Sequence, residues 1–146
     1  MEKLKFTTNI RAPRKKVWDV MLNDDTYRIW ASVFMPGSYA ETDWKEGSKA
    51  LFLGQDGSGM VSRIEKNIPN EYLSIQHLGF IKDGVEDLTS EKVKQWSGAH
   101  ENYTLKENNG VTEVLVELDS DDEFKDYFGS TWPKALEKVK ELSEKN

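Results

Sequence analysis

The 146 residues include 26 acidic and 20 basic ones, giving a net charge of −6, and no cysteine. An acidic surface repels phosphate backbones, so we do not expect a nucleic-acid partner. Disulfides and thiolate chemistry are excluded, and no apolar run approaches the roughly 18 residues of a membrane span. The N-terminus does not resemble a signal peptide, so we expect one cytoplasmic domain over residues 1–146, without integral membrane contact.

The first thirty residues predict one strand and two short helices. Apolar residues alternate over 3–10, which is typical of a strand. A proline suits the first position of a helix over 13–22, because its missing N–H has no partner there in any case. Asp24 or Asp25 is then expected to cap a second short helix through Trp30.

The middle of the chain predicts short strands joined by tight turns. The strand candidates are 37–43, 49–53, 60–65 and 72–78, separated by glycine-rich or asparagine-rich turns. The segment 81–97 interrupts this series with an Asp83-Gly84 turn and a short helix capped by Thr89 or Ser90.

The C-terminal third predicts a hairpin followed by a long helix. Strands over 99–106 and 112–118 are joined by a turn at Asn108-Asn109-Gly110. Ser120-Asp121-Asp122-Glu123 has the pattern of a capping box. The helix that follows has a broad apolar stripe, and Pro133 is expected to kink it or split it near Ser130.

Such a stripe needs a broad apolar partner, and the sheet is the available one. Sequential strands with tight turns form an antiparallel meander, which must curve to wrap a helix. We therefore predict an α+β domain in which about six or seven antiparallel strands wrap a long C-terminal helix. The two short helices after the first strand should close one end.

Several short motifs occur in the order seen in a known superfamily. Ile10-Arg11-Ala12-Pro13 followed by Val17-Trp18 resembles the opening of START-like (SRPBCC) domains, which include the birch-pollen allergen fold. The chain also resembles one branch, named after the activator of the heat-shock-protein-90 ATPase. The motifs carrying that resemblance are Trp30, Gly47, the strand 59–65 leading to Pro69, and Trp132-Pro133 with Leu136.

The resemblance implies a helix-grip fold with a cavity between sheet and long helix. Members bind lipids, hormones or polyketides, some are cyclases or hydratases, and one branch stimulates a chaperone ATPase. The superfamily has no universal catalytic residues to carry over. The segment 81–97 is longer here than in the simplest members.

Aromatic residues are the main candidates for contact with a ligand. They make up 11% of the chain although 32% of it is charged, so they need a place to be buried. A small-molecule cavity is usually lined by apolar and aromatic side chains with a few polar anchors; the alternative is that the aromatics simply fill the core. The candidate ligand-binding residues are Trp30, Tyr39, Phe52, His77, Trp96, Glu101, Tyr103, Phe128 and Trp132.

Two of these candidates are ionisable. His77 alternates with Leu73 and Ile75, so it should face inward. It is then an anchor for a ligand carboxylate, an acid–base group, or a core or rim histidine with a backbone or tyrosine partner. Glu101 alternates with Tyr103 and either points inward near His77 or reaches solvent at the strand end.

Three functions remain open from the sequence. The first is a binding module for a small apolar or amphipathic molecule. The second is an interaction domain that contacts a chaperone, with a filled core and an exposed patch. The third is a cyclase-like or hydratase-like enzyme, for which His77 and Glu101 are the available pair. We expect no cofactor and no metal, because two histidines without cysteine match no zinc spacing.

Overall fold

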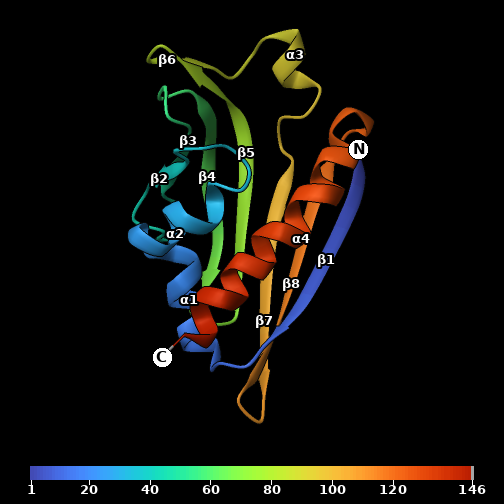
Figure 1. Cartoon of the computed structure of the whole chain (residues 1–146). Helices are drawn as coiled ribbons and strands as arrows, with labels where there is room; N and C mark the ends of the chain where they lie inside the picture. Colours follow the sequence, from blue (N-terminus) through green and yellow to red (C-terminus); the bar gives the residue numbers. More distant parts are fainter. Residues whose placement is uncertain (146) are drawn as a thin grey trace.

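The chain folds into an antiparallel sheet that curves around its long C-terminal helix (Figure 1). The computed structural model describes residues 1–145. The strands are β1 (Glu2–Ile10), β2 (Tyr39–Glu41), β3 (Lys49–Leu53), β4 (Gly59–Ile68), β5 (Tyr72–Lys82), β6 (Val85–Asp87), β7 (His100–Asn108) and β8 (Val111–Ser120). The helices are α1 (Arg14–Leu22), α2 (Asp24–Ala31), α3 (Glu91–Lys94) and α4 (Asp122–Glu144). None of these helices has the length and apolar character that crossing a membrane requires.

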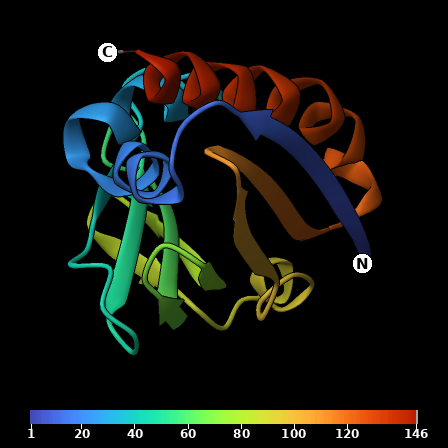
Figure 2. The same cartoon turned by 90° about the horizontal axis from the view of Figure 1, so that it is seen from below.

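The strand order is β1-β8-β7-β5-β4-β3-β2, and the short β6 pairs with β5. All the pairs are antiparallel, as expected for a meander with tight turns. The first strand, β1, lies at one edge of the sheet and pairs with the last strand, β8. Seen from below, the sheet bends into a cup, with α4 across its concave side and α1 and α2 at one end (Figure 2). The α+β prediction is therefore confirmed, including the two short helices.

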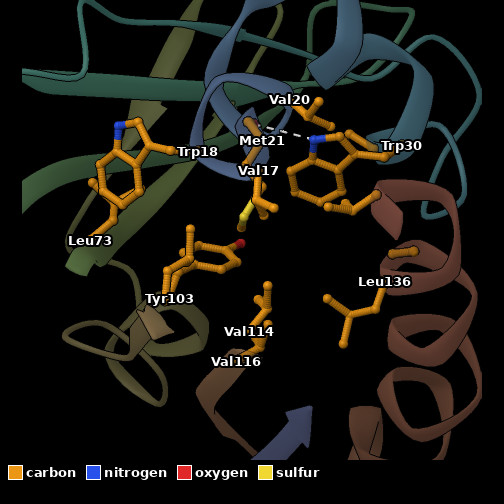
Figure 3. Close-up of a cluster of buried hydrophobic side chains, with 14 of the residues drawn as sticks. Val17, Trp18, Val20, Met21, Trp30, Leu73, Tyr103, Val114, Val116 and Leu136 are labelled. Carbon is orange, nitrogen blue, oxygen red and sulfur yellow. Dashed lines mark hydrogen bonds between the residues drawn. The ribbon is translucent and has the colours of Figure 1, made fainter. Parts of the chain in front are cut away.

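The core fills the space between the cup and its helices. Ala135, Leu136 and Val139 of α4 belong to one buried cluster with Val114 and Val116 of β8. Figure 3 shows part of this cluster, in which side chains from α1, α2 and α4 converge with those of β7 and β8. The predicted apolar stripe of α4 and the inward face of β8 are thus partners in one core.

Three helix starts differ from the sequence prediction by one residue. Pro13 is the N-cap of α1, because its ψ of 151° is extended and the helix begins at the next residue. Asn23 precedes α2, so Asp24 and Asp25 lie in its first turn and do not cap it. At α4 the cap is Asp121, whose carboxylate accepts from the amide of Phe124 at 3.3 Å.

The helix α4 and the segment 81–97 also differ from the sequence prediction. Pro133 lies inside α4, which is one uninterrupted helix of 23 residues, so the predicted split near Ser130 is wrong. The carbonyl that Pro133 deprives of a partner belongs to Gly129, which is exposed and can be hydrated. The segment 81–97 contains an unpredicted strand, β6, which pairs with the end of β5.

Candidate functional site

Four polar side chains form a continuous row across the inner face of the sheet. The Ser62 hydroxyl on β4 lies 2.7 Å from Nδ1 of His77 on β5. Nε2 of His77 lies 3.1 Å from Oε1 of Glu101 on β7, and the Tyr103 hydroxyl donates to the other oxygen of Glu101. We call Ser62, His77, Glu101 and Tyr103 the inner polar row.

The strand register explains why these four residues meet. Ser62 is the direct cross-strand partner of His77, because a register shift between Val61 and Ser62 leaves one extra residue, Leu78, on β5. Glu101 pairs with Ile75, which places its side chain diagonally across from His77. A regular ladder would have aligned Ser62 with Leu78 instead.

The hydrogen bonds indicate the tautomer of His77. An ionised Glu101 only accepts hydrogen bonds, so Nε2 of His77 carries the proton that is donated to it. In the neutral ring Nδ1 is then an acceptor, and the hydroxyl of Ser62 donates to it. The hydrogen bonds of the row therefore all donate in the direction of Glu101, from Ser62 through His77 on one side and from Tyr103 on the other.

Glu101 carries the charge of this row. Burial raises the pKa of this carboxyl, but three effects outweigh burial: the hydrogen bond from His77, the positive charge that His77 has when it is protonated, and the hydrogen bond from Tyr103. The pKa of Glu101 therefore lies below the usual value. Burial, followed by the charge of Glu101, raises the pKa of the Tyr103 and Tyr27 hydroxyls. The site thus holds one anion and opposes the formation of a second one.

Aromatic side chains also link His77 to Tyr103 by contacts that do not pass through Glu101. His77 meets Phe52 with ring centroids 6.0 Å apart, and Phe52 lies 6.4 Å from Tyr27 of α2. Tyr27 contacts Trp30 at 5.0 Å, Trp30 contacts Trp132 of α4 at 6.1 Å, and Trp132 contacts Tyr103 at 5.9 Å. These six side chains and Glu101 form a closed loop of contacts, which we call the aromatic cluster.

Trp132 has an unusual polar atom for a core residue. Its side chain is buried, with 3% of its surface exposed. Its indole N–H nevertheless has no hydrogen-bond partner among residues 1–145, whereas the indole of Trp30 donates to the carbonyl of Met21 at 3.2 Å. A buried donor without an acceptor is costly, so this N–H is a position at which an acceptor group would stabilise the fold.

The structure brings some of the nine candidate residues together and separates others. The aromatic cluster contains six of the candidates: Trp30, Phe52, His77, Glu101, Tyr103 and Trp132. Tyr39 on β2 lies under the guanidinium of Arg28, 5.0 Å from its ring centroid. Trp96 follows α3, and Phe128 packs against Phe124 and Tyr127 near the start of α4.

Three members of this neighbourhood escaped the sequence analysis. Ser62 shares the inner face of β4 with Ile64, a period-two signal that could have found it. Tyr27 lies three residues before Trp30, at helical spacing, and points to the same cluster. Trp44 contacts both Tyr27 and Phe52 from the loop before β3, and no periodicity marks a loop residue.

The chemistry available to this row is hydrogen bonding and proton transfer. His77 and Glu101 make the contact that an acid–base pair requires. Ser62 is 1% exposed, which fits a partner of His77 and not an attacking nucleophile. Within residues 1–145, no group of three or more acidic or histidine side chains is placed to hold a metal ion.

Two open depressions lie elsewhere on the surface. One, of about 470 Å³, lies between β1 and α4 and is lined by residues such as Phe6 and Lys125. The other, of about 510 Å³, lies beside the β7–β8 hairpin and is lined by Asn9 and Lys106 among others. Neither is lined by the inner polar row, whose neighbours are packed side chains.

A curved antiparallel sheet holding a C-terminal helix, with two short helices after the first strand, defines a helix-grip domain of the START-like superfamily. Residues 11–144 match the family model described as Activator of Hsp90 ATPase homolog 1-like protein. The chain belongs to this family. No curated protein matches the sequence significantly.

Solved structures share the fold at low sequence identity. Protein MLL2253 from Mesorhizobium loti has a TM-score of 0.72 and 15% identity, covering 97% of this chain and 96% of its own. Protein ChR145 from Cytophaga hutchinsonii has a TM-score of 0.71 and 20% identity, covering 99% and 94%. The Aha1 dimer from Colwellia psychrerythraea has a TM-score of 0.70 and 17% identity, covering 99% and 97%. Similarity at this level establishes the fold alone.

Proposed function

We propose that this chain binds a small amphipathic molecule between the inner face of the sheet and helices α2 and α4. The observation that carries the proposal is the inner polar row. An apolar side chain would be the less costly choice at each of its positions, because a half-buried carboxylate loses hydration. A ligand with a polar end gives these groups a use that core packing does not.

The surroundings of the row support this proposal. The side chains of His77 and Glu101 keep 15% and 22% of their surfaces exposed, so solvent reaches these two members of the row. The other side chains of the aromatic cluster offer an apolar wall, within which Trp132 adds an indole N–H that has no partner among residues 1–145. Apolar walls with a few convergent polar groups are typical of small-molecule sites.

Tryptophan fluorescence and amide chemical shifts test the proposal with a panel of fatty alcohols, sterols and aromatic polyketide-like compounds. We expect saturable changes, with shifted amides at His77, Tyr103 and Trp132. The fluorescence change should be weaker in Trp132→Phe, in which Trp30 remains as a second reporter in the aromatic cluster. It should be unchanged in Trp96→Phe, a matched substitution outside that cluster. If no compound produces a saturable change while the interior amides stay protected, the aromatics are core residues and the proposal is wrong.

A second candidate is contact with a chaperone, which the family description suggests. It is favoured by two large apolar side chains exposed on the first half of α4, Phe124 at 47% and Tyr127 at 43%. Tyr127 also fixes the loop after α2, since its hydroxyl donates to the carbonyl of Phe34 at 2.8 Å. Exposed aromatic side chains are enriched in protein interfaces.

An ATPase assay with purified Hsp90 tests this second candidate. Stimulation should fall in Phe124→Ser and remain in Val85→Ser, a control at another exposed apolar residue on β6. Amide shifts on adding Hsp90 should map to the first two turns of α4. An unchanged ATPase rate together with unchanged spectra would exclude this candidate.

A further inference from the structure

We infer that the polar end of the ligand is an uncharged or cationic hydrogen-bond donor, such as a hydroxyl or an ammonium group, and that carboxylates such as fatty acids are selected against. This inference rests on the proposed binding function and specifies its ligand class. It follows from what Glu101 still offers to a ligand and from the charges around it.

Glu101 has acceptor capacity to spare. A carboxylate has about four lone-pair sites. Within residues 1–145, one oxygen of Glu101 is used by Nε2 of His77 and the other by the hydroxyl of Tyr103. A ligand hydroxyl or ammonium could therefore donate to Glu101 without displacing either partner. A ligand carboxylate has nothing to donate.

The charged groups that contact Glu101 also bear on which ligand it accepts. Among residues 1–145, its only ion-pair partner is His77, whereas the lysine and arginine ion pairs are made with other carboxylates. Glu101 therefore has no lysine or arginine in ion-pair contact among residues 1–145, and a second anion beside it would add to an existing negative charge. Like charges placed together at an interface disfavour binding.

Two tyrosine hydroxyls that sense the charge of Glu101 are also disfavoured as anions. Burial and then the negative charge of Glu101 raise the pKa of both Tyr27 and Tyr103, which means that a second anion is unfavourable at either hydroxyl. A ligand carboxylate placed near Glu101 would meet the same burial and the same charge. A neutral or cationic group would not.

A matched series of ten-carbon ligands separates this inference from the proposed function. Decanol, decylammonium and decanoate share one chain and differ only in the polar end. Binding is measured at about pH 8 by tryptophan fluorescence, calorimetry and amide shifts. We expect decanol and decylammonium to bind, and decanoate to bind at least about tenfold more weakly, because of like-charge repulsion.

Two variants locate the effect. Glu101→Gln keeps the shape and removes the charge, so decanoate should gain affinity and decylammonium should lose it. Glu117→Gln makes the same charge change on the opposite face of the sheet, next to Lys5, and should preserve the wild-type order. This comparison uses ratios between ligands, so a modest change in stability does not affect it.

The outcomes are distinct. Decanoate binding as tightly as decanol to the wild-type protein would overturn the inference and leave the binding function in place. An order that changes equally in both variants would also overturn it, because the cause would then be net charge and not Glu101. Failure of all three ligands to bind would count against the proposed function itself, and the inference would fall with it.

Discussion

Replacing Trp132 with alanine is expected to lower the free energy of unfolding by about 3–5 kcal/mol, the range for truncating a large buried aromatic residue. Trp132 is 3% exposed and contacts the rings of Phe6, Phe34, Trp30 and Tyr103. Alanine would leave a cavity between α4 and the sheet, which packed neighbours cannot close. Urea unfolding followed by circular dichroism measures the loss.

Two further substitutions make this prediction specific. Trp132→Phe keeps a ring and discards an N–H that has no partner in the described chain, so it should cost less, about 1–2 kcal/mol. Trp96→Ala removes the same side chain from a half-buried position after α3 and should cost clearly less than Trp132→Ala. Equal losses at Trp132 and Trp96 would mean that Trp132 is not a centre of the core.

The sequence predicted much of the fold because its signals are local. Period-two alternation predicted the start of β1 to within one residue. The Asn109-Gly110 turn joins β7 to β8 as predicted, with positive φ at both residues. The helix starts were displaced by one residue because a capping side chain and its neighbour look alike in sequence. β6 was missed since three residues carry too little periodicity.

The candidate site was harder to predict because it depends on pairing between distant strands. Alternation predicts that His77 faces inward, but it left Glu101 either inward or in solvent at the strand end, and it does not fix the distance between the two residues. That distance comes from the pairing of β5 with β7, across the segment that contains β6 and α3. The contact with Ser62 depends on one extra residue in β5, and a one-residue bulge has no reliable sequence signature.

The same row explains why family membership leaves the ligand open. The fold requires an apolar surface on the sheet and α4, which many sequences satisfy, and structures sharing 14–20% identity keep it. The inner polar row is an addition to that requirement, set by four particular residues. Function therefore has to be argued from the row and not from the fold.

The second large effect concerns acid stability and Glu101. Because the folded-state pKa of Glu101 lies below its usual value of about 4.5, the ionised form stabilises the folded state. This contribution is complete above the unfolded-state pKa and is lost as the pH falls through the folded-state pKa. We therefore expect the wild-type protein to lose stability steeply below about pH 4.5, and Glu101→Gln to lose less over the same range.

Urea unfolding at pH values from about 7 to about 3 measures this difference. At neutral pH the glutamine can accept from Tyr103 and donate to a reversed tautomer of His77, so Glu101→Gln should cost about 1–2 kcal/mol. Glu101→Ala leaves both partners unpaired and should cost more, about 2–4 kcal/mol. Glu117→Gln controls for net charge and should keep the wild-type slope. Parallel slopes for wild type and Glu101→Gln would show that Glu101 is not held ionised by His77 and Tyr103, and the electrostatic basis of the ligand preference would be lost with it.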